Sequence, residues 1–229
     1  MKVSIIIPCF NEEKTISLVI NKILSSYTGE KEIILIDDFS NDKTREILNS
    51  DLKNKIDKII FNDKNYGKGF SIKKGINNAT GDIILIQDAD LEYDPSDYNK
   101  LIKPIEKGVA DVVYGSRFLG GEEKRVLYFW HTLGNKFLTT LSNMFSNLNL
   151  TDMEVGYKLF KSNVIKDISL FEDRFGFEPE VTAKIAKKQI RIFEVGISYY
   201  GRKYEDGKKI TWKDGISALR CIVKYNLFD

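Results

Sequence analysis

The chain reads Ile83-Ile84-Leu85-Ile86-Gln87-Asp88-Ala89-Asp90-Leu91-Glu92, a short apolar run that leads directly into an acidic cluster. Side chains two residues apart on an extended backbone point the same way, so Asp88, Asp90 and Glu92 are expected to converge at the end of a buried strand. Carboxylates this close repel one another unless a cation lies among them. Oxygen ligands of this kind favour Mg²⁺ or Mn²⁺, which completes its coordination with water and substrate phosphates. We therefore predict a divalent metal site here; the alternative is a solvated acidic turn.

The acidic cluster lies within an alternation of strand and helix patterns. Short β-branched runs predict buried strands over residues 2–7, 32–36, 56–61, 83–87 and 109–114. Apolar residues at helical spacing predict helices between them, over residues 12–26, 42–50, 68–78 and 96–106. Asn11 or Asn41 as an N-cap, and the turn Asp94-Pro95-Ser96, are expected to begin helices. This alternation indicates an α/β fold with a mostly parallel central sheet flanked by helices.

The second half of the chain has a less regular pattern. We expect helices over residues 125–148, 177–188 and 212–225, a strand over 190–197 and a mobile polar loop over 200–210. Most of the aromatic stripe on the first of these helices is expected to pack into the core. Phe129 and Trp130, near its start, are the side chains that we expect to be available to lipid. The 229 residues suit a single large domain.

Ligands of parallel sheets bind at the carboxyl ends of the strands, and polar residues gather at four such ends here. They are Pro8 and Glu12, Asp37 and Asp38, Asp88 and Asp90, and Gly115-Ser116-Arg117. Asp38 is expected to accept hydrogen bonds from a nucleobase or ribose, whereas Asp42 is expected to have a structural, capping role. The glycine-bearing turn around Lys68 opens a helix, so its backbone amides and the lysine are predicted to hold an anion. A purely structural turn is the alternative there.

Composition narrows the possible partners and compartments. Lys and Arg number 35 against 33 Asp and Glu, so no overall positive field indicates nucleic acid. Cys9 and Cys221 form no disulfide framework, which favours a reducing cytoplasm. No run of apolar residues is long enough to predict a membrane-spanning helix. A lipid substrate would therefore be met at the membrane surface, or through a membrane-protein partner.

Taken together, these stretches resemble glycosyltransferase family 2, which has the nucleotide-sugar-binding GT-A fold. The resemblance is carried by residues 5–12, 36–44, 65–69, 79–82, 87–95 and 115–118. It is closest to the dolichol- or polyprenyl-phosphate hexosyltransferase branch, where it extends through residues 152–154 and 156–160 to Arg202. Two positions depart from the pattern. Phe39 follows the aspartate pair where the family usually has Gly, and Glu92 stands where this branch often has Gln.

The resemblance implies a role for each matching residue. Nucleotide-sugar binding is implied for Pro8, Phe10, Glu12, Asp38, Lys68, Asp88 and Ala89. Asp88 is expected near the ribose and the metal, with Asp90 and Glu92 as direct metal ligands. Arg117 and Arg202 are expected to face phosphate, and His131 is a secondary candidate at the acceptor site. Asp152 and Glu180 are the candidate bases if the acceptor is a hydroxyl; otherwise Asp152 is expected to order the acceptor loop.

The function implied by the resemblance is inverting transfer of a hexose, with Mg²⁺ or Mn²⁺, from UDP- or GDP-hexose to dolichyl or undecaprenyl phosphate. Residues 1–118 would form the nucleotide-sugar-binding half of the catalytic domain and 119–229 the acceptor half. The expected location is cytoplasmic, peripheral at the inner face of the membrane. Two alternatives stay open, namely a family 2 enzyme acting on a saccharide hydroxyl and a non-catalytic nucleotide-sugar-binding subunit of a membrane partner. A sugar-phosphate nucleotidyltransferase is disfavoured, because the first strand lacks a following glycine- and arginine-rich loop.

Overall fold

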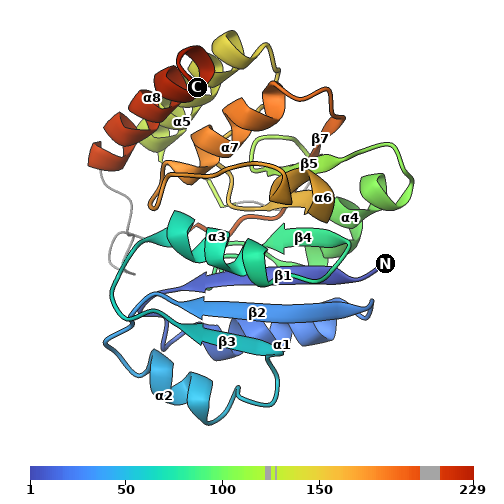
Figure 1. Ribbon diagram of the computed structural model, residues 1–229, viewed down its shortest axis with the longest axis vertical. Helices are drawn as coiled ribbons and strands as arrows, with labels where there is room; N and C mark the ends of the chain where they lie inside the picture. The colour runs from blue at the N-terminus through green and yellow to red at the C-terminus, as the bar shows by residue number, and fades with distance from the viewer. Residues whose placement is uncertain (122–124, 127, 202–211) are drawn as a thin grey trace.

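A single seven-stranded sheet forms the centre of the molecule in the computed structural model, which describes residues 1–121, 125–126, 128–201 and 212–229. The strands lie in the order β3-β2-β1-β4-β6-β5-β7 (Figure 1). Their bounds are β1 Val3–Cys9, β2 Lys31–Asp37, β3 Lys58–Phe61, β4 Ile83–Ile86, β5 Val112–Ser116, β6 Lys158–Lys161 and β7 Ile192–Gly196. Strand β6 runs antiparallel to β4 and β5, and the other neighbours are parallel. The mostly parallel α/β fold that we predicted is confirmed.

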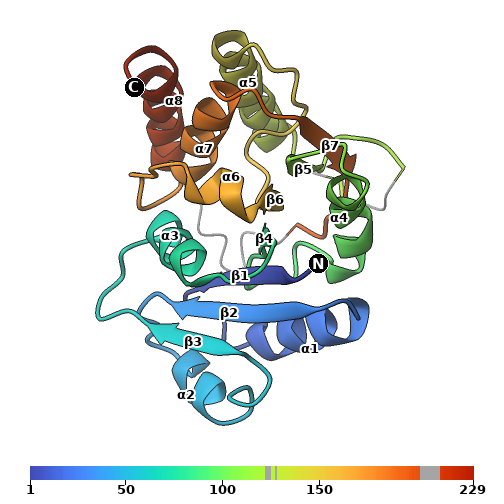
Figure 2. The same cartoon turned by 45° about the vertical axis from the view of Figure 1, so that its right-hand side comes forward.

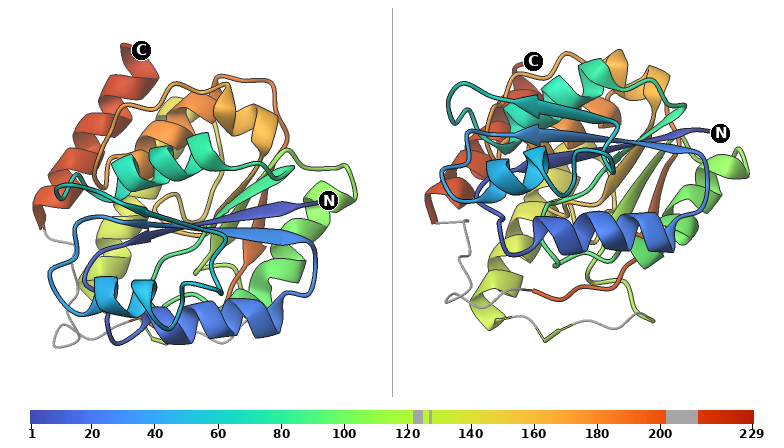
Figure 3. Two further views of the ribbon diagram at one scale, coloured as in Figure 1. Left: turned by 60° about the horizontal axis from the view of Figure 1, so that its bottom comes forward. Right: turned by 90° about the horizontal axis from the view of Figure 1, so that it is seen from below.

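Helices cover both faces of the sheet, with α1 and α3 on opposite sides (Figure 3). Their bounds are α1 Ile16–Ser26, α2 Thr44–Asn49, α3 Lys68–Asn78, α4 Tyr98–Glu106, α5 Phe129–Ser146, α6 Ser162–Lys166, α7 Phe177–Ala186 and α8 Trp212–Leu227, with a 3₁₀ turn η1 at Pro95–Asp97. Helices α5, α7 and α8 lie together beyond the β4–β7 half of the sheet (Figure 2). Because both faces are covered, every residue of β4 is buried and the strand shows no apolar–polar alternation.

Helix starts were predicted correctly at one place and wrongly at two. Asp94 caps η1, since its side chain accepts a hydrogen bond from the Ser96 amide at 2.9 Å. Neither Asn11 nor Asn41 is an N-cap, because α1 begins at Ile16 and α2 at Thr44. The Asn11 side chain instead accepts a hydrogen bond from the Asn41 amide at 2.9 Å. These two asparagines therefore join the loops that follow β1 and β2.

Strand β6 and helix α6 were not predicted. Strand β6 has only four residues, with lysine at both ends, and such a run gives little strand signal. Lys158 is nevertheless fully buried in the structure, because β6 lies between β4 and β5. Residues from the second half of the chain thus enter the centre of a sheet built mainly from the first half.

Helix α5 faces the opposite way from the prediction. Its buried residues are Thr139 and Ser142, whereas Leu133, Phe137, Met144 and Phe145, for which core packing was expected or implied, are exposed. Phe129 and Trp130 are exposed too, as expected of them. The polar face is turned inward because it bonds to the segment before β6, where Thr139 Oγ1 accepts from the Met153 amide at 3.2 Å. Asn143 likewise exchanges two hydrogen bonds with the Leu150 backbone. In the parts of the chain that the structure describes, no helix is both long and apolar enough to cross a bilayer.

Candidate active site

The loops that follow β1 and β2 form one connected unit at the carboxyl edge of the sheet. The amides of Asn11 and Glu12 donate to the side-chain oxygens of Ser40 and Thr44, each at 2.9 Å. Glu12 is buried, and its carboxylate accepts a hydrogen bond from the Thr15 hydroxyl at 2.6 Å. The predicted nucleotide-site residues Pro8, Phe10 and Glu12 therefore share a rigid support, although their contact with a nucleotide stays a prediction.

Phe39 keeps the backbone conformation that suits the glycine of the resembled pattern. Its φ is +66°, in the left-handed region that side chains with a Cβ rarely adopt. The ring is 44% exposed, and the Arg45 guanidinium lies 5.1 Å from its centroid. Phe39 thus adopts in this turn a backbone conformation that glycine would adopt more readily.

Asp38 is buried and supports the turn that opens α3. Its carboxylate accepts hydrogen bonds from the amides of Tyr66 at 3.0 Å and Gly67 at 2.7 Å, and from the Asn62 side chain at 2.8 Å. Both oxygens are used in this way, so in this conformation the side chain holds the turn together. Asp42 has the structural role expected of it, since it accepts from the amides of Thr44 and Glu13.

The backbone of the acidic loop after β4 is held from two sides. The Gln87 side chain accepts hydrogen bonds from the hydroxyls of Tyr98 at 2.6 Å and Tyr157 at 2.5 Å, and it donates to the Asp88 carbonyl at 2.9 Å. The Thr15 hydroxyl donates to the Ala89 carbonyl at 3.1 Å. This buried network places Asp88 and Ala89 at a fixed position on the sheet edge.

The three carboxylates of this loop do not converge as one ligand set. Lys68 Nζ lies 2.8 Å from Asp88 Oδ1, Asp90 Oδ1 accepts from the Glu92 amide at 3.1 Å, and Glu92 Oε2 accepts from the Tyr199 hydroxyl at 2.9 Å. Across the described ranges, no group of three or more His, Cys, Asp and Glu side chains is arranged to hold a metal ion. Each of the three side chains has a different partner in this structure, so their joint role as metal ligands stays a prediction.

A smaller protein contribution still fits a divalent ion. Mg²⁺ is commonly bound through one or two carboxylates together with substrate phosphates, and Asp88 and Asp90 provide two partly exposed carboxylates on one fixed loop. Gly156 leaves the space that Asp88 occupies, since a Cβ at that position would collide with Asp88 Oδ2. Asp88 and Asp90 are thus the residues that would hold the ion, while Glu92 anchors the loop to Tyr199.

Arg117, which is partly buried, and Asp152, which is fully buried, form a two-pronged ion pair beside this loop. Arg117 Nε and Nη2 donate to the two carboxylate oxygens of Asp152, each at 2.7 Å, and the Arg117 amide donates at 3.1 Å. Burial opposes the charge on Arg117, but Asp152 keeps the pKa of its guanidinium well above the ordinary value. Asp152 is fully buried, and its own position is fixed by the Asp152 amide bonding to Glu194 at 3.0 Å. This geometry supports the loop-ordering role of Asp152 over the role of a base.

A second set of buried charges was missed by the sequence reasoning. Lys158 donates to the carbonyls of Met153 at 2.9 Å and Val155 at 2.5 Å, and burial lowers its pKa to about 8. Burial, and then the neighbouring Glu178, raise the pKa of Glu154 to about 8. Among the described residues, Glu154 Oε1 and Glu178 Oε2 are buried without a hydrogen-bond partner. The available signal was the occurrence of Glu154 and Lys158 four residues apart in an otherwise apolar stretch.

Lys68 connects these charges to the acidic loop. Its Nζ lies 2.8 Å from Asp88 Oδ1 and 3.1 Å from Glu178 Oε1, so one cation bridges two carboxylates. Burial opposes its charge, but Asp88 and Glu178 raise the pKa of Lys68 above its ordinary value. Lys68 was expected to help bind an anionic ligand; in this structure the anions it contacts belong to the protein.

The remaining candidates lie in three different situations. Glu180 is fully buried, and its carboxylate accepts from the amides of Phe171 and Glu172, each at 2.8 Å, so this geometry favours a structural role over that of a base. His131 is exposed at the start of α5, with its ring 6.0 Å from that of Tyr128. Arg202 and most of the predicted loop 200–210 lie outside the described residues.

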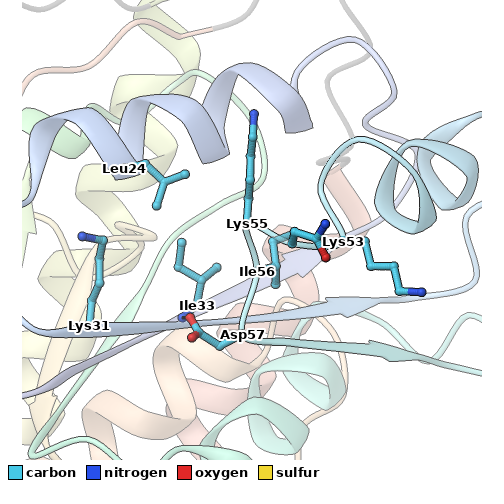
Figure 4. A pocket seen from close by; sticks show the side chains of 8 residues that line it. Leu24, Lys31, Ile33, Lys53, Lys55, Ile56 and Asp57 are labelled. Carbon is cyan, nitrogen blue, oxygen red and sulfur yellow. Dashed lines mark hydrogen bonds between the residues drawn. The ribbon is translucent and has the colours of Figure 1, made fainter.

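A surface depression near the amino ends of β2 and β3 contains none of the candidate site residues (Figure 4). It is lined by Leu24, Lys31, Ile33, Lys53, Asn54, Lys55, Ile56 and Asp57. Strand β2 begins at Lys31, so this depression lies at the amino end of the strands. The candidate site at their carboxyl ends is separate from it.

The sheet and the acidic loop at the end of β4 define an α/β protein with the GT-A fold, and comparison with known proteins gives the family. The family model for glycosyl transferase family 2 matches residues 4–169, and the chain belongs to this family. Glucosyl-3-phosphoglycerate synthase from Mycobacterium tuberculosis, solved with Mn²⁺, UDP and phosphoglyceric acid, superposes with a TM-score of 0.77 at 16% identity. That superposition covers 100% of this chain and 79% of the other.

Relatives in sequence are named as polyprenyl-phosphate sugar transferases. Undecaprenyl-phosphate 4-deoxy-4-formamido-L-arabinose transferase from Photorhabdus laumondii is 29% identical over 90% of this chain and 62% of its own length. Dolichol-phosphate mannosyltransferase from Pyrococcus furiosus is 29% identical over 98% of this chain and 63% of its own length. Dodecaprenyl-phosphate galacturonate synthase from Rhizobium johnstonii is 24% identical over 89% of this chain and 60% of its own length. The chain thus spans about three fifths of the length of these relatives.

Proposed function

We propose that this protein transfers a hexose from a nucleoside-diphosphate sugar to a polyprenyl phosphate, with inversion at the sugar C1. The observation that carries the proposal is the combination of the acidic loop at Asp88 and Asp90 with the Arg117–Asp152 pair beside it. A family 2 fold with relatives named for polyprenyl phosphates supports this acceptor class over others. The nucleotide and the hexose are left open, with UDP and GDP sugars as the donors to test first.

The donor would lie at the carboxyl ends of β1, β2 and β4. Pro8, Phe10 and Glu12 would line the base and ribose pocket, and Asp38 would act from the turn that it supports. Asp88 and Asp90 would hold Mg²⁺ or Mn²⁺, which supplies Lewis-acid stabilisation to the departing diphosphate. A related fold solved with Mn²⁺ and UDP supports this choice of ion and donor group.

The acceptor phosphate would lie against Arg117. Two of the guanidinium N–H groups are bound to Asp152, and this fixes the direction in which the guanidinium lies. Arg202 would provide a second cation for this phosphate. His131, on helix α5, would be a secondary candidate at the same acceptor site. A phosphate oxygen is already anionic at neutral pH, so its attack on C1 requires no base. This matches the positions of Asp152 and Glu180, whose carboxylates are occupied by protein donors.

We also propose that the protein works at the cytoplasmic surface of a membrane, directly or through a membrane-protein partner. The supporting observation is the outward apolar face of α5, where Trp130 is 77% exposed and Met144 is 75% exposed. Helix α8 packs against α5 and adds exposed apolar side chains, including Ile216. Aromatic side chains on such a face suit the interfacial region of a bilayer.

The test is a transfer assay with a panel of donors and acceptors. Purified protein is incubated with radiolabelled UDP- and GDP-hexoses, undecaprenyl phosphate in detergent, and Mn²⁺ or Mg²⁺. The proposal predicts that label enters the organic phase with one donor and that chelation of the metal prevents this. Label found only in a saccharide product would favour the hydroxyl-acceptor alternative. Donor binding without transfer or hydrolysis would favour a non-catalytic binding subunit.

A further inference from the structure

Lys68 occupies a position between three elements that meet at the site. It is the first residue of α3, and its Nζ contacts Asp88 after β4 and Glu178 in the first turn of α7. The lysine side chain is only 17% exposed and that of Glu178 only 5%. One cation therefore neutralises, from inside the protein, a carboxylate that would hold the divalent ion.

The backbone around Lys68 is fixed, so only its side chain is free to change partner. Gly67 has a φ of +111°, and its amide is held by Asp38 at 2.7 Å. A Cβ on either Gly67 or Gly69 would collide with the backbone at residues 172–174. Helix α3 is thus seated tightly against the segment that leads to α7 and Glu178.

Glu178 has unused capacity to accept hydrogen bonds. Its Oε1 lies 3.1 Å from Lys68 Nζ, whereas its Oε2 is buried and has no hydrogen-bond partner among the described residues. A buried carboxylate oxygen without a partner is unfavourable, so this group is suited to receive a donor. The ammonium needs only a small side-chain rotation to bond more fully to Glu178, because it already contacts both carboxylates.

We propose that Lys68 is an internal counter-ion that holds Asp88 in the metal-free protein and passes to Glu178 when a divalent cation binds Asp88. The inference rests on the metal site of the proposed function. Two like charges on one carboxylate repel each other strongly in a low-dielectric environment, so ion and ammonium compete for Asp88. When the ion displaces the Lys68 ammonium from Asp88, the ammonium stays paired with Glu178, so no buried charge is left without a partner. Lys68 and Glu178 are positioning residues in this scheme, and the competing interaction keeps the loop ordered before the ion arrives.

The test measures binding of Mn²⁺ alone, in the absence of nucleotide, from the electron paramagnetic resonance signal of the free ion. Lys68→Met removes the competing cation, and we expect it to bind Mn²⁺ about tenfold more tightly than the unaltered protein. Lys68→Arg keeps the charge and should bind as the unaltered protein does. Lys73→Met is the matched control, since Lys73 lies on the same helix but pairs with Asp173. Equal, weaker or undetectable Mn²⁺ binding in Lys68→Met would overturn the proposal.

Glu178→Gln tests the second half of the exchange. It should weaken Mn²⁺ binding several-fold when Lys68 is present and have little effect in the Lys68→Met background, because there is then no ammonium to receive. The same loss in both backgrounds would show that Glu178 acts independently of Lys68, and the exchange would be wrong. Circular dichroism melting confirms that each variant is folded. No sugar donor or acceptor is present, so failure of hexose transfer in the separate assay leaves these binding results interpretable.

Discussion

Glu32 shows how much one buried carboxylate contributes at the amino end of the sheet. It lies in β2 and accepts hydrogen bonds from the Ser4 hydroxyl, from the Thr80 amide at 2.6 Å and from Lys2 Nζ at 2.9 Å. Burial raises the pKa of Glu32, but these hydrogen bonds outweigh it and lower the pKa from 4.5 to about 2. The ionised form is therefore the one that stabilises the junction of β1, β2 and the turn before β4.

The first prediction concerns the pH dependence of this contribution. A carboxyl group with a lowered pKa stabilises the fold above its unfolded-state pKa, and the stabilisation is lost as pH falls through the folded-state value. Glu32→Gln should therefore reduce the free energy of unfolding by about 1 to 2 kcal/mol at pH 7, since water screens part of the interaction. The difference from the unaltered protein should shrink between pH 4.5 and about 2. Urea unfolding of both proteins across this pH range checks the prediction. A stability difference between them that does not depend on pH would contradict it.

The Arg117–Asp152 pair gives a second prediction. Arg117→Met leaves the Asp152 carboxylate buried and unpaired, which should lower the free energy of unfolding by about 3 kcal/mol. Arg117→Met combined with Asp152→Asn removes the uncompensated charge and should recover much of that loss. Urea unfolding of both variants measures the effect. A double variant that is less stable than Arg117→Met alone would show that the pair is not coupled in this way.

At the scale of elements, α5 determines how the protein would meet a membrane. Trp130, Phe137 and Met144 are 77%, 59% and 75% exposed, so replacing all three with serine should change the free energy of unfolding by less than about 1 kcal/mol. The same change should weaken binding to vesicles of anionic phospholipid by at least about tenfold, because it removes apolar area from the face proposed to meet lipid.

The matched control for α5 replaces exposed apolar residues elsewhere. Leu18 on α1 and Phe193 on β7 are 53% and 41% exposed, and changing both to serine should leave vesicle binding unaltered. Co-sedimentation with vesicles gives the comparison. If both triple and control variants bind vesicles as well as the unaltered protein, α5 is not the membrane-facing element.

The elements also show what the sequence could and could not predict. Helix α3 was predicted at both ends, because a glycine turn and a helical apolar pattern define it locally. The position of Asp88, Asp90 and Arg117 at strand ends followed from strand–helix alternation. The orientation of α5 did not follow, since an amphipathic pattern does not say which face meets the protein. That is decided by the hydrogen bond that Thr139 accepts from Met153 and the one that Asn143 donates to Leu150.

Residues brought together from distant parts of the chain were the hardest to predict. Strand β6 enters the sheet between β4 and β5, and this places Lys158 and Glu154 among buried charges that local patterns do not reveal. The acidic loop was located correctly, but the partners of its side chains were not. Lys68 and Tyr199, which contact Asp88 and Glu92, come from other elements.

At the scale of the whole molecule, the sheet brings both halves of the chain to one edge. Lys68 and Asp88 come from the first half, whereas Asp152 and Glu178 come from the second, and all four lie in one connected set of charges with Arg117. In the proposed function, this set of charges would lie between the metal–diphosphate end of the donor and the acceptor phosphate.

Donor binding should depend on this shared edge. Asp90→Ala removes a proposed, partly exposed metal-binding carboxylate, so it should preserve the melting temperature while weakening Mn²⁺-dependent binding of the nucleotide sugar at least about tenfold. Titration calorimetry with and without Mn²⁺ measures this. Unchanged affinity for the donor in Mn²⁺ would remove Asp90 from the site.

The most direct test of the central claim is a single-turnover measurement of hexose transfer to undecaprenyl phosphate. With the preferred nucleotide sugar and Mn²⁺, the unaltered protein should form a hexosyl-phosphate lipid whose anomeric configuration is inverted relative to the donor. Asp90→Ala, and the unaltered protein in excess chelator, should form none above background. Retention of configuration, or equal product formation by Asp90→Ala without free metal, would contradict the proposed function.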